Sequence, residues 1–303
     1  MRGLLFVFTF LAFTSVSFAS SENLSWPVKD PENLRLKKLI SLDHKSLPVS
    51  GKDVVVAVID TGASAATEPL AKHLVPGWNF IDNNASTMDF DGHGTPVAGI
   101  VTLIAPSVKI MPLLVIKEYG SQDDIVNATV YAIKRNVPVI NLSVTFTEEM
   151  LRRVRDTVGD ERFKKSLLVL ASGNSGERYP SLQEKWPNVI VVGTIGLDLP
   201  IHSTSYSVYG PDVDIAAPSG DAEDGIATYS PFSTSLHPFN GTSGAAPVVS
   251  GAAALLKEKY PKAQGADLKK MLITKTCHSK DINVFEGRLL NIGRLFDKAY
   301  KCF

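Results

Sequence analysis

The distribution of apolar residues predicts a chain in which buried strands alternate with amphipathic helices. Five continuous apolar runs, rich in β-branched residues, are typical of strands that are buried on both faces. These runs span residues 53–59, 108–116, 137–142, 167–170 and 189–192. Residues 123–135 and 148–158, which lie between them, have the periodicity of helices. Because strand–helix alternation produces a parallel sheet, the sequence predicts an α/β fold with helices on both faces of a mostly parallel sheet.

The pattern becomes less regular after Gly193. Short strands are predicted near residues 214–216 and 226–229, and helices at about 245–260 and 266–276. The chain contains no internal repeat, low-complexity tract or linker, and 44% of its residues are hydrophobic. We therefore expect one domain over residues 51–303, with residues 20–50 as a segment that leads into it.

The first 19 residues have the pattern of a secretory signal peptide. Arg2 precedes an uncharged apolar stretch at residues 4–13, and a small-x-small site ends at Ala19. The alternative is an uncleaved anchor helix, but the apolar stretch is shorter than the roughly 20 residues that a membrane span needs. We expect cleavage after Ala19 and a secreted or periplasmic protein that has no membrane association once the signal is removed.

Charge excludes one class of partner. The 31 basic and 31 acidic residues cancel, whereas proteins that bind nucleic acid or anionic lipid mainly by charge carry a basic excess. We expect no nucleic-acid partner, and we expect the protein to be a monomer.

Three polar side chains stand where regular elements meet loops. Asp60 ends the first predicted strand, His93 lies between two glycines just before a helix, and Ser243 lies in a tight turn at a helix start. Each alone is equally typical of a turn or a cap. Together they supply a serine nucleophile, an imidazole to accept its proton, and a carboxylate to orient the imidazole. Free N–H groups at the helix start could bind an oxyanion.

Five sequence blocks resemble the landmarks of the subtilisin-like serine proteases. They are VVVAVIDTG at 54–62, DGHGTPVAG at 91–99, VINLS at 139–143, ASGNSG at 171–176 and NGTSGAAPVVSG at 240–251. The order Asp, His, Ser along the chain is also that of subtilisin. The resemblance implies a single-domain subtilisin-like fold and an endopeptidase that cuts protein or peptide substrates through an acyl-enzyme.

The resemblance also implies individual roles. Asp60 would orient His93, His93 would act as general base and then acid, and Ser243 would attack the carbonyl carbon. Asn174 and the Ser243 N–H would form the oxyanion hole. Two segments would bind the substrate: Ser143, Val144 and Thr145 on one side, and Ala171, Ser172 and Gly173 on the other. Thr145 stands where glycine is usual, so we expect a narrowed side-chain pocket.

Several positions depart from the family pattern. Pro96, Gly244 and Val248 replace His, Met and His, none of which transfers a proton. The loop that binds calcium in many relatives is shortened, although Asp82, Asp89 and Asp91 remain as oxygen donors. We expect no cofactor, with structural calcium as the alternative. Residues 20–50 are too short for the family's inhibitory prodomain, and none is expected.

The two cysteines are expected to pair. Cys277 and Cys302 are the only cysteines, and export would place them in an oxidising compartment. The alternative is two free thiols.

Two other functions stay open. An α/β-hydrolase esterase would need G-x-S-x-G and the order Ser, Asp, His, but Ala245 breaks the motif and the order differs. A catalytically silent relative that binds peptides is favoured by Gly244, Thr145 and the missing prodomain, and opposed by the complete triad.

Overall fold

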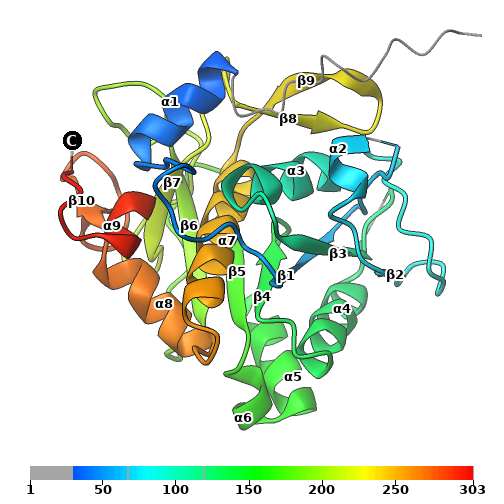
Figure 1. Ribbon diagram of the computed structural model, residues 1–303. Helices are drawn as coiled ribbons and strands as arrows, with labels where there is room; N and C mark the ends of the chain where they lie inside the picture. The colour runs from blue at the N-terminus through cyan, green and yellow to red at the C-terminus, as the bar shows by residue number, and fades with distance from the viewer. Residues whose placement is uncertain (1–29, 67, 119, 303) are drawn as a thin grey trace, which may run out of the picture.

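The computed structural model describes residues 30–66, 68–118 and 120–302 (Figure 1). The predicted signal peptide lies outside these residues. The described part contains a nine-stranded sheet in the order β10-β11-β7-β6-β5-β4-β1-β3-β2, which is parallel except where β10 meets β11. Its strands are β1 Val55–Asp60, β2 Trp78–Asn79, β3 Lys109–Leu114, β4 Val139–Leu142, β5 Leu167–Ala171, β6 Val189–Ile195, β7 Ile215–Pro218, β10 Cys277–His278 and β11 Arg288–Leu289.

Helices cover both faces of the sheet, as the sequence predicts. Side chains of β1 alternate between two apolar clusters: Val56 and Val58 join one, and Ala57 and Ile59 join the other. The first cluster includes α3, α7 and α8, with α7 at the centre of the domain, whereas the second includes α4 and α5 (Figure 1). The helices are α1 Pro31–Leu39, α2 Glu68–Ala71, α3 Gly94–Ile104, α4 Gln122–Lys134, α5 Glu148–Val158, α6 Asp160–Phe163, α7 Thr242–Lys259, α8 Gly265–Thr274 and α9 Ile292–Phe296, with a short 3₁₀ turn at Phe285–Gly287.

Strand order places a crevice at the carboxyl end of β1. The chain passes from β1 to β3 on one side of β1, and then to β4 on its other side. Such a reversal opens a crevice at the carboxyl ends of the strands, which is where open α/β sheets bind ligands. Asp60 ends β1, and Ser143 directly follows β4. The topology therefore brings the two predicted site segments to one edge.

Several predicted boundaries differ in the structure. The first strand begins at Val55 because Asp53 has a φ of 59°, which is incompatible with an extended strand. The third strand ends at Leu114 rather than residue 116. Helix α7 begins at Thr242, earlier than predicted, so Ser243 lies within its first turn.

One element without a counterpart in the apolar pattern is helix α1. Helix α1 packs beside the two-stranded sheet formed by β8 Ile226–Ser230 and β9 Ser233–Phe239 (Figure 1). Asn33 of α1 donates to the Ala227 carbonyl at 2.8 Å and accepts the Ala227 N–H at 3.1 Å. The side chain of Asn33 thus satisfies the outer edge of β8.

Among the described residues, no helix is both long and apolar enough to cross a membrane.

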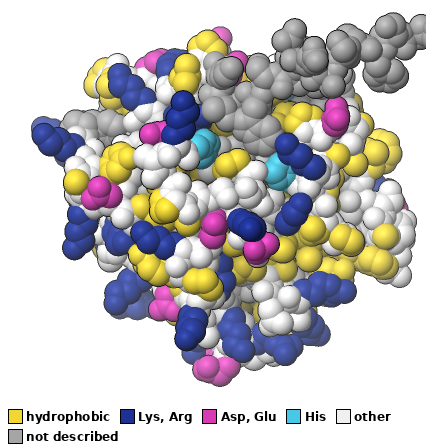
Figure 2. Space-filling view, in the orientation of Figure 1, with side chains coloured by type: hydrophobic (Ala, Val, Ile, Leu, Met, Phe, Trp, Pro, Cys, Tyr) yellow, Lys and Arg dark blue, Asp and Glu magenta, His cyan; other side chains and the backbone are white. Residues whose placement is uncertain are grey.

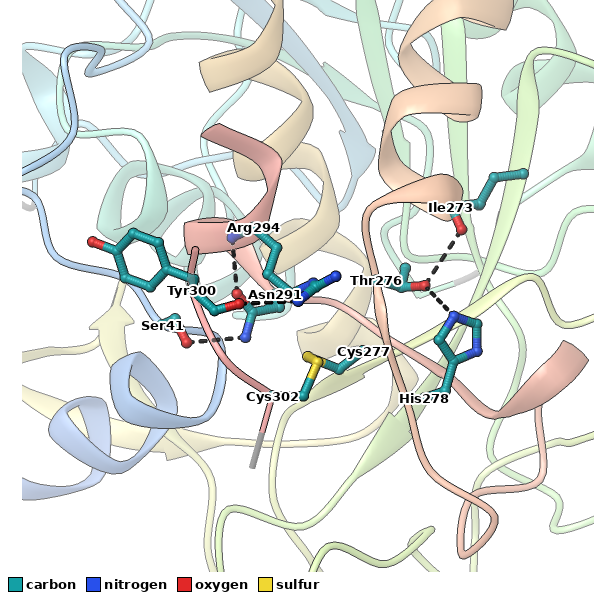
Figure 3. The surroundings of a disulfide bond; sticks show 9 residues. All are labelled: Ser41, Ile273, Thr276, Cys277, His278, Asn291, Arg294, Tyr300 and Cys302. Carbon is teal, nitrogen blue, oxygen red and sulfur yellow. Dashed lines mark hydrogen bonds between the residues drawn. A yellow bond between two sulfur atoms is a disulfide. The ribbon is translucent and has the colours of Figure 1, made fainter. Parts of the chain in front are cut away.

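A disulfide joins Cys277 and Cys302, which confirms the predicted pair (Figure 3). It ties the C-terminal tail to β10, at the edge of the large sheet. Asn291 donates to Ser41 Oγ at 2.9 Å, and Arg294 donates to the Tyr300 carbonyl at 3.0 Å (Figure 3). The tail and the N-terminal segment are therefore held against the same part of the domain.

Removing the disulfide should lower stability. The bond closes a loop of 25 residues. Its loss should lower the free energy of unfolding by about 3 kcal/mol, because the unfolded chain gains conformational entropy. Urea unfolding of the Cys277→Ser/Cys302→Ser double variant, compared with the oxidised parent protein, measures this. Equal unfolding midpoints would show that the bond adds nothing to the stability of the domain.

Candidate active site

Asp60 and His93 form a hydrogen-bonded pair at the end of β1. The Asp60 side chain is fully buried, and its Oδ1 accepts the Thr61 N–H at 2.8 Å and His93 Nδ1–H at 2.7 Å. Since Nδ1 carries the proton that Asp60 accepts, Nε2 of the neutral ring is an acceptor. The ring of Phe239 packs edge-on against the imidazole, with centroids 5.3 Å apart. The pair therefore fixes both the tautomer and the orientation of His93.

The loop that carries His93 is built around the buried carboxylate of Asp89. Its Oδ1 accepts hydrogen bonds from Thr61 Oγ1 and from the N–H groups of Asp91 and Gly92, while Oδ2 accepts from the N–H and Oγ1 of Thr95. These five bonds tie the end of β1 to the start of α3. The sequence analysis considered Asp89 only as a metal ligand. The signal for its actual role is an Asp placed three residues before a glycine turn, which is the spacing of a side-chain-to-backbone bond.

The pKa of His93 is raised above its ordinary value. Burial lowers this pKa. The charge and hydrogen bond of Asp60 raise it, and the charges of Asp91 and Asp89 raise it further. The neighbouring carboxylates outweigh burial because they stabilise the imidazolium. His93 is thus a stronger base than a free imidazole.

Ser243 lies in the first turn of α7, against the end of β4. Its carbonyl accepts a hydrogen bond from Ser143 Oγ at 2.9 Å. Its own Oγ donates to the Ser143 carbonyl at 3.4 Å, and in the part of the chain described it makes no hydrogen bond to His93. The proton of the hydroxyl must therefore leave the Ser143 carbonyl before the imidazole can accept it.

Asn174 and the start of α7 present two free N–H donors. Oδ1 of Asn174 accepts from both the N–H and Oγ1 of Thr242 at 2.9 Å, which leaves Nδ2 as the free end of the amide. Nδ2 lies next to Gly241, where a Cβ atom would be 3.2 Å away. Across the described residues, the Ser243 N–H has no hydrogen-bond partner. Both groups are suited to binding a developing oxyanion.

The two predicted substrate-binding segments follow neighbouring strands. Ser143 is buried, Val144 half-buried and Thr145 exposed at the end of β4. At the end of β5, Ala171 and Gly173 are half-buried, and Ser172 is buried with its hydroxyl bonded to the Val208 carbonyl at 3.1 Å. The structure therefore places the two segments at the same edge of the sheet.

The three acidic side chains considered as calcium ligands do not fit a metal site. Asp89 uses both oxygens for its five protein donors. Asp82 is paired with Lys117 and Asn79, and the Lys117 hydrogen bond contributes most to lowering its pKa. Over residues 30–66, 68–118 and 120–302, no group of three or more His, Cys, Asp and Glu side chains could hold a metal ion.

Comparison with known proteins identifies the family of this chain. The model of the Subtilase family matches residues 51–292. Thermitase from Thermoactinomyces vulgaris is 32% identical over 68% of this chain and 75% of its own length. Subtilisin Savinase from Lederbergia lenta is 31% identical over 80% and 90%, respectively. The solved nisin leader peptidase NisP from Lactococcus lactis has a TM-score of 0.74 at 21% identity, covering 88% of this chain and 94% of that one, which shows the fold.

The fold and these relatives define a serine endopeptidase with a parallel α/β sheet. The chain belongs to the subtilase family.

A side chain at Gly244, the residue after Ser243, would collide with the Ser219 hydroxyl in its observed position. A Cβ atom at Gly244 would lie 2.2 Å from Ser219 Oγ, and Ser219 is fully buried with that oxygen unpaired among the described residues. Ser219 therefore occupies the space that a larger residue at Gly244 would need. Glycine at 244 is thus compatible with Ser219 in its observed position, whereas the methionine that the family usually carries there would require Ser219 to move.

This contact predicts a compensating pair of substitutions. Gly244→Ala should destabilise the protein by about 1–3 kcal/mol because the new methyl group overlaps Ser219 Oγ. Ser219→Gly should remove most of that loss when combined with Gly244→Ala. Thermal unfolding of the two single variants and the double variant tests the coupling, and strictly additive changes would contradict it.

Proposed function

We propose that this subtilase is exported and hydrolyses peptide bonds through Asp60, His93 and Ser243, with an acyl-enzyme intermediate. The observation that carries the proposal is the 2.7 Å bond between buried Asp60 and His93, at the edge where Ser243 begins α7. That arrangement provides a base of fixed tautomer for a serine nucleophile. The substrates are proteins or peptides, and the reaction needs no cofactor.

The residues of the proposed triad have distinct roles. His93 Nε2 accepts the proton of Ser243 Oγ as that oxygen attacks the scissile carbonyl carbon. Asp60 stabilises the imidazolium, and His93 then gives the proton to the leaving amine. Nδ2 of Asn174 and the Ser243 N–H stabilise the oxyanion of the tetrahedral intermediate. A water molecule, activated by His93, then hydrolyses the acyl-enzyme.

Separate observations support export and an action on polypeptides alone. The N-terminal signal pattern and the disulfide are both expected of a secreted or periplasmic protein. The 31 basic and 31 acidic residues cancel, so the chain has no basic excess for nucleic acid, and Figure 2 shows acidic side chains among the basic ones on the visible face. The same features are consistent with a monomer that works free of the membrane. Recovery of the cleaved protein only from the cytoplasm would contradict export.

The central experiment is labelling with a serine-directed fluorophosphonate, followed by a peptide-hydrolysis assay. Wild type should label and cleave, and Ser243→Ala should do neither. Asn174→Ala should fold normally but turn over about 100- to 1000-fold more slowly, as when subtilisin loses its own side-chain oxyanion donor. A folded wild type that neither labels nor cleaves would favour the peptide-binding alternative, in which the Ser243 hydroxyl stays on the Ser143 carbonyl.

The raised pKa of His93 predicts the acid limb of the activity profile. The general base must be neutral, so kcat/KM should fall as pH drops through the pKa of His93. Because Asp60 raises that pKa, the fall should begin at a higher pH than for an ordinary histidine, whose pKa is about 6.5. Asp60→Asn should move the limb to lower pH while reducing the rate. A limb centred below pH 6 in wild type would contradict this assignment.

Thr145 sets a second expectation, for specificity. We propose that Ser143, Val144, Thr145, Ala171, Ser172 and Gly173 line the groove for the residues before the scissile bond. A β-branched Thr145 should restrict the pocket to small or medium side chains, and Thr145→Gly should extend cleavage to Phe and Tyr. Cleavage-site profiling with a peptide library measures both variants. A wild-type preference for large aromatic residues would place the pocket wall elsewhere.

A further inference from the structure

Tyr206 connects two segments that lie far apart along the chain. Its phenolic oxygen accepts the Gly241 N–H at 3.1 Å, and its hydroxyl donates to the Gly220 carbonyl. Its backbone carbonyl accepts the Gly176 N–H at 2.7 Å. One half-buried residue therefore contacts both the loop after β5 and the turn before α7.

These two segments carry the two free N–H donors of the site. Gly176 follows Asn174 by two residues, and Gly241 precedes Ser243 by two residues. Gly241 also lies directly against Asn174 Nδ2, because a Cβ at Gly241 would be 3.2 Å from that nitrogen. A shift of Gly241 would thus move one donor relative to the other.

The position of Gly241 depends on hydrogen bonds rather than on packing. It has no side chain, and its φ of 85° lies in the left-handed region that favours glycine. The neighbouring Asn240 side chain donates to the carbonyls of Asp221 and Asp224 at 2.7 and 3.0 Å. Together with the bond from Tyr206 to Gly220, these contacts attach the turn to residues 220–224. Among the residues that make these contacts, Tyr206 is the one that also reaches the Asn174 segment, through its backbone carbonyl.

We propose that Tyr206 is a positioning residue that sets the spacing between Asn174 Nδ2 and the Ser243 N–H. This inference rests on the proposed function, in which those two groups bind the oxyanion. Donors must lie within hydrogen-bond distance of the oxyanion to be effective, so their relative placement acts on the transition state rather than on substrate binding.

The test removes one oxygen atom. Tyr206→Phe should lower kcat about 10-fold with little change in KM, less than the loss from deleting a donor, because both donors remain but are misaligned. Tyr209→Phe is the matched control: Tyr209 is on the same segment and its backbone also bonds to the loop after β5, at Glu177 and Tyr179, but among the described residues its hydroxyl has no hydrogen bond. That control should keep wild-type kinetics.

A double-mutant cycle separates positioning from general weakening. Combined with Asn174→Ala, Tyr206→Phe should cost much less than 10-fold, because the donor whose spacing it sets is already gone. The same fold loss in both backgrounds would overturn the proposal, and so would a Tyr206→Phe enzyme with wild-type kcat.

A second readout does not depend on activity. In the Ser243→Ala background, which prevents self-digestion, Tyr206→Phe should accelerate hydrogen exchange of the Gly241 amide, and Tyr209→Phe should not. Unchanged exchange at Gly241 would overturn the proposal. Accelerated exchange in a protein whose wild type cleaves nothing would instead show that the contact exists and that the proposed function has failed.

Discussion

The start of α7 has to be held against the carboxyl ends of β4 and β5, and the rest of the site depends on this contact. On the β4 side, the fully buried Asn141 donates to Ser143 Oγ at 3.0 Å and accepts from Ser250 Oγ at 2.9 Å. Because Ser143 Oγ receives a hydrogen bond from Asn141, its single proton is directed to the Ser243 carbonyl. This series of hydrogen bonds, from Ser250 through Asn141 and Ser143 to the Ser243 carbonyl, crosses an apolar layer. Because every group in the series is bonded, breaking one bond would leave a buried polar group without a partner.

A buried carboxylate creates the second requirement. Asp60 is fully buried, and its Oδ2 has no hydrogen-bond partner within the described residues, so the charge relies on Oδ1 and its two donors. Separating His93 from Asp60 would leave a poorly compensated charge in the interior. The five bonds around Asp89 hold the His93 loop in place and so prevent that separation. Orientation of the imidazole and stability of the loop are consequences of the same arrangement.

Much of the sheet and the site could be predicted from sequence because the relevant signals are local. The apolar run ending in Asp60, the glycines around His93 and the turn before Ser243 each lie within a few residues. Helix α1 could not be predicted in this way, since its anchor is the contact between Asn33 and Ala227, which lie 194 positions apart. The same holds for Tyr206, whose phenol contacts backbone 14 and 35 positions away. The close approach of Gly244 to Ser219, which follows β7, is likewise a contact between distant segments.

The segment before β1 supports the structure of the candidate site, although its polar sequence does not indicate this. Asn33 satisfies the outer edge of β8, and Arg35 pairs with Asp224 at 3.3 Å in the loop that also holds Asn240. The end of α1 is in turn fixed by the C-terminal region, where the Ile292 N–H donates to the Ile40 carbonyl at 2.6 Å. Since β8 continues through β9 to Phe239, which packs on His93, both ends of the described chain support the hairpin and loop that border the candidate site. Loosening α1 should therefore disturb the His93 side and the Ser243 side together, because α1 contacts both β8, which leads to Phe239, and Asp224, which binds Asn240.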